Sequence, residues 1–183
     1  RTVPVPDDAP DAMRLLQPLT GKPVLFIANV DEGDLAVPEV VSAHASEEGA
    51  GAVAISSRLE AELSELSDED AAAMRADLEL DESGIEMVVR GAFELLELIA
   101  FFTAGEEKPA QSWHLRRGLT AWDAAGAIHT DIQKGFVRAE IIGWDSLVEA
   151  GGYAPARDRG TLRTEGRDYK MTDGDVITVN FTP

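Results

Sequence analysis

Two short apolar runs, each bounded by chain-breaking residues, limit most strongly how this chain can fold. The first, residues 24–30, follows Pro23, and the second, residues 52–55, is closed by Ser56. Short runs rich in branched residues are typical of strands buried on both faces of a sheet. The intervening residues 38–48 have helical spacing. A strand, a helix and a second strand in this order predict a parallel α/β unit.

The pattern of apolar residues changes near Ile99. Before it, helical spacing predicts helices at residues 12–19, 59–66, 68–80 and 86–99, with Ser67 as an N-cap. After it, short apolar segments predict strands at 100–105, 112–116, 136–142 and 176–181, of which 112–116 and 136–142 alternate in polarity. A helix is predicted at 121–128, with Thr120 as its cap. We also expect Thr130 or Asp131 to cap a short helix that ends at Gly135. The sequence therefore predicts an α/β domain over residues 1–99 and an α+β domain over residues 100–183.

The composition excludes several classes of protein. The formal net charge of −18 opposes non-specific binding to phosphate backbones, which needs a positive field. There is no cysteine, so disulfides, zinc–thiolate sites and cysteine nucleophiles are excluded within these residues. The three histidines are not paired at metal-binding spacing, so no metal site is predicted. No apolar run approaches the ~20 residues that span a bilayer, and we expect a cytoplasmic protein without a membrane partner.

The first chemical signal directly follows the first predicted strand, at Asn29-Val30-Asp31-Glu32. Ligands of open α/β sheets bind beyond the carboxyl ends of the strands. The spacing is that of the N-K-x-D motif of GTPases, in which the Asp accepts hydrogen bonds from guanine. Glu32 is one methylene longer than that Asp and should not superpose on the guanine donors, whereas Asn29 can pair with the N6/N7 edge of adenine. An asparagine that only caps a strand–helix turn explains the motif equally well.

A second loop follows the second predicted strand, where Ser56-Ser57 takes the place of another base-contacting segment. The parts that grip phosphates are missing from these residues, because no G-x-x-x-x-G-K-[ST] loop occurs. Nothing in the sequence marks a magnesium ligand or a catalytic residue of a nucleotide hydrolase. We therefore assign no catalytic and no metal-binding residue, and we expect this chain alone not to hydrolyse nucleotides.

Residues 22–32, KPVLFIANVDE, resemble the K-P-x-x-Y-x-x-N-x-x-E segment of the YchF family of Obg-like ATPases. Further segments follow the C-terminal TGS domain of that family in order: 101–105, Trp113, 124–131, 134–140, 165–169 and 173–177. The resemblance covers about residues 13–181 and departs from the family at Trp122-Asp123 and Ser112. It implies that residues 1–99 are the C-terminal part of a P-loop GTPase-like domain, with a partial parallel sheet, and that residues 100–183 form a β-grasp TGS domain.

The resemblance also implies a function. The intact protein would bind ATP in preference to GTP and hydrolyse it with magnesium. Asn29 would contact the adenine edge and the Val30 backbone would contact the base. Glu32 would stand at the guanine-reading position, and Ser56 would lie in the second base-side loop. The chain would then be the C-terminal portion of a ribosome-associated ATPase.

A basic series in the second half is the candidate for docking to the ribosome or its RNA, as the resemblance implies. Its members are Arg116, Arg117, Lys134, Arg138, Arg157, Arg159, Arg163, Arg167 and Lys170. Acidic residues interrupt the series, so a solvated loop surface explains it about as well. Two other functions remain open on the sequence. One is a non-catalytic TGS module that recognises the ribosome, RNA or a protein, and the other is an acidic α+β protein without a nucleotide.

Overall fold

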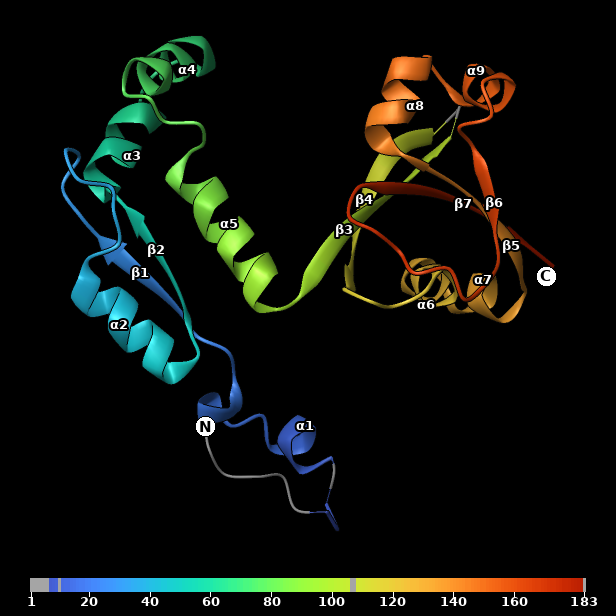
Figure 1. Ribbon diagram of the computed structural model, residues 1–183, viewed down its shortest axis with the longest axis horizontal. Helices are drawn as coiled ribbons and strands as arrows, with labels where there is room; N and C mark the ends of the chain where they lie inside the picture. The colour runs from blue at the N-terminus through green and yellow to red at the C-terminus, as the bar shows by residue number, and fades with distance from the viewer. Residues whose placement is uncertain (1–6, 10, 106–107, 183) are drawn as a thin grey trace. The chain divides into compact units, whose positions relative to one another are not determined.

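The computed structural model describes residues 7–9, 11–105 and 108–182. The chain divides into two compact units, residues 1–96 and 97–183, which are described separately (Figure 1). The first holds a two-stranded sheet with helices, and the second holds a five-stranded sheet with helices on both faces.

The first unit is built on two parallel strands, β1 (Leu25–Asn29) and β2 (Gly51–Ile55), joined by α2 (Glu39–Glu48). This confirms the predicted strand–helix–strand unit (Figure 1). Phe26 contacts the ring of His44 on α2, with the ring centroids 5.5 Å apart. Gly91 of α5 (Gly84–Leu95) faces the other side of the sheet so closely that a Cβ there would lie 3.2 Å from a methyl group of Val53. The two helices therefore pack on opposite faces, because successive strand residues point to opposite sides.

The prediction that β1 is buried on both faces is wrong at Ile27, whose side chain is 49% exposed. Ile27 lies two residues beyond Leu25 and therefore on the α5 side of the sheet. In the part of the chain that the structure describes, β1 pairs only with β2. A strand with a single neighbour lacks the lateral cover that would bury its middle residue.

The remaining elements of the first unit are α1 (Ala12–Leu16), the 3₁₀ turn η1 (Leu19–Gly21), α3 (Ser57–Ser64) and α4 (Asp68–Asp77). Ser67 caps α4 by accepting from the Asp70 N–H, which confirms the predicted cap. The predicted helices at 12–19, 68–80 and 86–99 extend too far. Three residues with positive φ, Gln17, Glu79 and Glu97, lie just beyond the three observed ends. A residue in the left-handed region cannot continue the helix.

The second unit holds a mixed sheet in the order β4-β3-β7-β5-β6. Its strands are β3 (Leu98–Gly105), β4 (Lys108–Arg116), β5 (Phe136–Gly143), β6 (Arg163–Glu165) and β7 (Asp175–Phe181). The central pair β3 and β7 is parallel and the other pairs are antiparallel. Four of the strands confirm the strands predicted from the sequence, whereas the three-residue β6 was missed because it is too short to show a period.

Helices cover both faces of this sheet. On one face, α6 (Ala121–Ile128) and α7 (Thr130–Lys134) close a core around Phe101, Ile141 and Ile177. The other face carries α8 (Trp144–Ala150) and α9 (Tyr153–Asp158) over a smaller cluster that includes Ile142 and Val176. Sequence patterns missed α8 and α9, each of which has at most two turns. None of the helices that the structure describes is long and apolar enough to cross a membrane.

Local hydrogen bonds define the two helices on the α6 face. Thr120 caps α6, as predicted, and it forms a capping box with Asp123. His129, rather than Thr130 or Asp131, caps α7, because its Nδ1 accepts the Asp131 N–H at 3.1 Å. Gly135 ends that helix, as predicted.

Candidate functional site

The carboxyl ends of β1 and β2 lie side by side, because Asn29 and Ile55 are register partners. The loops that leave these two ends border a cavity of about 280 Å³. It is lined by Asn29, Val30, Asp31, Glu32, Ser56 and Arg58. The structure thus brings all four residues of the sequence prediction into one cavity, although Ser56 is 27 positions beyond Asn29. The cavity is close to the lower end of the ~300–1,000 Å³ typical of ligand pockets.

Asn29 joins the two loops. Its Oδ1 accepts the backbone N–H of Ser57, the first residue of α3, at 3.0 Å. The oxygen is the atom that faces this donor, since an amide NH₂ group cannot accept a hydrogen bond. The Nδ2 group makes no hydrogen bond within the described residues and remains a donor at the cavity. The two interpretations of Asn29, as a base-contacting residue and as a cap, are therefore compatible. The Oδ1 atom binds the start of α3, and the Nδ2 group is left as a donor.

Val30 and Ser56 use their polar groups within the fold. The Val30 N–H donates to the Ile55 carbonyl at 2.9 Å, which extends the ladder between the strands by one residue. The Val30 N–H is therefore already used within the fold. The Ser56 hydroxyl accepts from the Leu59 N–H at 3.4 Å and caps α3, and its side chain is buried. Ser56 therefore shapes the floor of the cavity.

Sequence analysis missed one residue of the lining, Arg58, in the first turn of α3. Its Nε donates to Glu62 at 3.2 Å, and this hydrogen bond, together with the nearby charges of Glu32 and Asp31, raises the pKa of Arg58. The signal was present in the sequence, since a cation two positions after Ser56 is unusual in so acidic a segment. Only the register of the two strands shows that it shares a cavity with Glu32.

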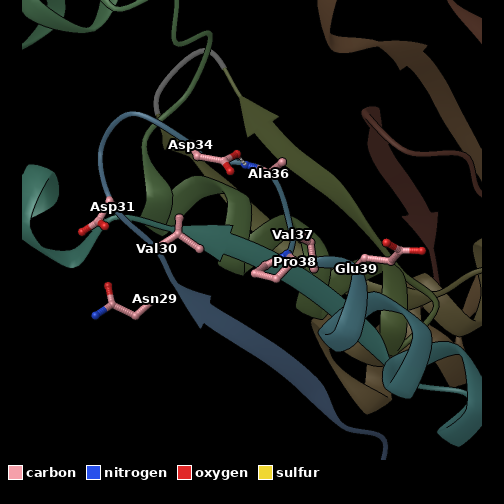
Figure 2. A pocket seen from close by; sticks show the side chains of 8 residues that line it. All are labelled: Asn29, Val30, Asp31, Asp34, Ala36, Val37, Pro38 and Glu39. Carbon is pink, nitrogen blue, oxygen red and sulfur yellow. Dashed lines mark hydrogen bonds between the residues drawn. The ribbon is translucent and has the colours of Figure 1, made fainter.

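A second, larger cavity of about 530 Å³ lies between the end of β1 and the start of α2. Figure 2 shows Asn29, Val30 and Asp31 at the end of β1 and Asp34 in the loop that returns to α2. Its charged lining residues, Asp31, Asp34 and Glu39, are all acidic. These carboxylates would repel a nucleotide phosphate, whereas the smaller cavity has one cation, Arg58, beside its two carboxylates, Asp31 and Glu32.

The residues present fit a purine base but not the triphosphate or its magnesium. Within the described residues, no group of three or more metal-ligating side chains comes together. The lining of the cavity includes the amide of Asn29, the carboxylates of Asp31 and Glu32, and one cation, Arg58. These groups can orient a flat, hydrogen-bonding ring.

The basic residues of the second unit divide into two groups. Most members of the 157–170 series have partners: Arg157 with Glu140, Arg163 with Glu165 and Asp175, Arg159 with the Glu149 carbonyl, and Lys170 with the Gly118 carbonyl. Lys134 pairs with Asp131. No ion pair within the described residues involves Arg116, Arg117, Arg138 or Arg167. The basic residues of the 157–170 series therefore mostly contact other groups of the same unit. Arg116 on β4 and Arg138 on β5, which form no ion pair within the described residues, are the better candidates for an interface.

Arg116 and Arg138 share one side of the sheet. Arg116 of β4 is the neighbour of Leu115, which lies in the α6-side core, and therefore points the opposite way. Arg138 of β5 is likewise the neighbour of the buried Ala139 of that core. Both arginines are exposed. They lie on the α8 side of the sheet.

Comparison with known proteins shows similarity to one family. Residues 98–182 match the family model YchF-GTPase_C, described as "Protein of unknown function (DUF933)". The chain is 34% identical over 187 residues to the ribosome-binding ATPase YchF of Bacillus subtilis, and 39% identical over 184 residues to the protein of the same name from Haemophilus ducreyi. These alignments cover 99% of this chain and 51% and 50% of the two relatives, so the chain spans about half the length of the curated relatives it matches.

Solved structures with a similar fold carry the YchF name or the name of a GTP-binding protein. The YchF GTPase of Schizosaccharomyces pombe superposes with a TM-score of 0.76 at 28% identity, over 98% of this chain and 49% of that one. A GTP-binding protein of Pyrococcus horikoshii, 22% identical with a TM-score of 0.58, shares the mixed α/β fold. The names of these proteins differ in the nucleotide, ATP or GTP. The chain belongs to the YchF family and corresponds to the C-terminal part of its members.

Proposed function

We propose that this chain supplies the base-recognition part of a YchF-family protein that binds and hydrolyses ATP in preference to GTP. In this proposal residues 1–99 belong to the GTPase-like nucleotide-binding domain and residues 100–183 form a TGS domain of the β-grasp type. The observation that carries the proposal is the single cavity at the ends of two parallel strands, lined by Asn29, Val30, Glu32 and Ser56.

The hydrogen-bonding groups of the cavity favour adenine. The Nδ2 group of Asn29 is a donor that suits the N7 acceptor of a purine. The Val30 carbonyl is an acceptor, which suits the N6 amino group of adenine and opposes the O6 oxygen of guanine. Glu32 is too long for the position from which an aspartate reads guanine. The phosphates and magnesium would be held by parts of the protein other than the residues described.

Titration of ATP and GTP into the whole gene product, with magnesium and calorimetric detection, tests this assignment. We expect ATP to bind at least about tenfold more tightly than GTP, because a mismatched carbonyl pair leaves a buried acceptor unsatisfied, at a cost of about 1–3 kcal/mol. CTP serves as the control for binding through phosphates alone. Equal affinities for ATP and GTP would contradict the roles given to Val30 and Glu32.

For the second unit we propose ribosome binding through the side of the sheet that carries Arg116 and Arg138. The support is the printed name of the bacterial relatives, ribosome-binding ATPase, and the lack of ion-pair partners for these two arginines within the described residues. Contacts between cations and the phosphates of RNA release counterions and weaken steeply with salt. Ribosome binding also implies a cytoplasmic location.

Arg138→Glu is expected to lower co-sedimentation of the whole gene product with ribosomes at low salt by about tenfold, because one phosphate contact is replaced by repulsion. Lys134→Glu is the matched control. Lys134 is exposed like Arg138, lies on α7 over the opposite face and is already paired with Asp131. Equal losses in the two variants would show that only overall charge matters, and an absence of ribosome binding in the unaltered protein would refute the docking proposal.

A further inference from the structure

The second unit exposes one tryptophan to an unusual degree. The side chain of Trp144, the first residue of α8, is 56% exposed. Tryptophan has a large apolar ring system with a single N–H donor, and it is on average highly buried. The Trp113 indole donates to the Thr103 hydroxyl at 3.0 Å, whereas the Trp144 indole has no hydrogen-bond partner within the described residues. An exposed aromatic ring with a free donor is typical of a binding surface.

Contacts with Gly174 hold the exposed ring in place. The Trp144 backbone N–H donates to the Gly174 carbonyl at 3.0 Å. The ring lies so close to Gly174 that a Cβ there would be 2.7 Å from the indole Cδ1. Gly174 has a φ of 84°, which also favours glycine at this position. Because the ring is already positioned by the fold, a ligand that stacks on it immobilises little side-chain freedom.

The strands beside Gly174 bring an arginine to the same surface. The Gly174 N–H donates to the Ala100 carbonyl at 2.9 Å, and Ala100 is the register partner of His114 on β4. Arg116 lies two residues beyond His114 and therefore on the same side of the sheet, the α8 side. Neighbouring strands are about 4.8 Å apart. The indole, His114 and Arg116 thus border one surface, whose floor consists of the small residues Gly174 and Ala100.

The charges on this surface are unevenly distributed. Asp145 and Asp173 are adjacent in sequence to Trp144 and Gly174, and their carboxylates accept backbone N–H groups of Ser146 and Ala100 at 2.7 and 2.8 Å. These two carboxylates oppose a phosphate directly beside the ring. His114 and Arg116 are exposed and form no ion pair within the described residues. The surface therefore suits a ligand with a flat group over the ring and an anionic group toward β4.

We propose that Trp144 stacks on an unpaired base of ribosomal RNA while Arg116 contacts a neighbouring phosphate. This inference rests on the ribosome binding proposed above and adds to it the class of RNA that is recognised. Proteins recognise single-stranded RNA through splayed bases that stack on aromatic side chains, whereas bases within a duplex are not available in this way. The partner is thus a loop or a single-stranded segment.

The test measures the fluorescence anisotropy of labelled octauridylate, titrated with the whole gene product at low salt. Uridine avoids the adenine site proposed for the first unit. Trp144→Leu keeps an apolar side chain against Gly174 but has no aromatic face, and we expect it to weaken binding by about tenfold. Trp144→Phe retains a ring that can stack and should keep most of the affinity.

Trp122→Leu is the matched control. Trp122 is 38% exposed and lies on α6, over the opposite face of the sheet, so its replacement should leave the affinity for octauridylate unchanged. Equal affinities of Trp144→Leu and the unaltered protein would overturn the proposal. An equal loss in Trp144→Leu and Trp144→Phe, or equal binding of octauridylate and an RNA duplex of the same length, would overturn it as well.

Co-sedimentation with ribosomes separates this inference from the proposed function. If the unaltered protein binds ribosomes but not octauridylate, the inference fails and the docking proposal stands, with a ribosomal protein as the partner. If octauridylate binding depends on Trp144 but ribosomes are not bound, the docking proposal alone fails. If neither is bound, both fail.

Discussion

Asn29→Asp is expected to weaken the binding of ATP by about 100-fold in the whole gene product. The variant keeps an oxygen that can accept the Ser57 N–H, so the link between β1 and α3 is preserved. It replaces the free Nδ2 donor by a second oxygen, which faces the N7 lone pair of the purine. Loss of a hydrogen bond that discriminates a base costs about 1–3 kcal/mol, and the repulsion adds to this cost.

Comparison of Asn29→Ala with Asn29→Asp separates the two roles of the Asn29 side chain, base contact and support of the Ser57 N–H. Asn29→Ala removes both the base contact and the acceptor for Ser57, so it should weaken binding and also lower the stability of the first unit by about 1 kcal/mol. Calorimetric titration measures the affinities, and far-ultraviolet circular dichroism during urea unfolding measures the stability. Unchanged ATP affinity in Asn29→Asp would show that the base does not bind beside this residue.

Phe101→Ala is expected to lower the free energy of unfolding of the second unit by about 3–5 kcal/mol. The Phe101 side chain is fully buried in β3, between β4 and β7, and its ring lies 6.5 Å from that of Trp113, centroid to centroid. Truncation to alanine leaves a cavity that a sheet held on both sides cannot close. Small domains are stable by only about 5–15 kcal/mol, so the loss removes much of the stability of this unit.

Tryptophan fluorescence during urea unfolding isolates this effect in the full chain. All three tryptophans and both tyrosines lie in residues 97–183, so the emission reports only the second unit. The control is Val137→Ala on β5, where the side chain is 61% exposed and truncation should change stability by no more than about 0.5 kcal/mol. Similar urea midpoints for the two variants would contradict the position of Phe101 at the centre of the core.

Local features of the fold could be predicted because their causes are local. The short apolar run at 24–30 specifies a strand, and Ser67 and Thr120 cap helices through hydrogen bonds to residues three positions away. The ends of helices were less predictable. Glu97 ends α5 by adopting a left-handed conformation, which no side-chain pattern required.

The candidate site was predictable only in part. Their position selected Asn29, Glu32 and Ser56, because polar residues that directly follow buried strands must gather at one edge of a parallel sheet, whereas the role of the Val30 backbone was implied only by the resemblance to the YchF family. The sequence did not select Arg58, because membership of the cavity depends on the register that pairs Asn29 with Ile55.

The sequence by itself determined the longer strands and helices and the polar residue types that follow β1 and β2, since those depend on neighbours a few positions apart. Only the tertiary structure decided that Asn29 Oδ1 reaches the backbone of Ser57, 28 residues along the chain, and that Ile27 stays half exposed. It also decided that the basic loop series is used mostly in internal contacts. These outcomes depend on strand pairing and packing between distant segments, which no local pattern of residues specifies.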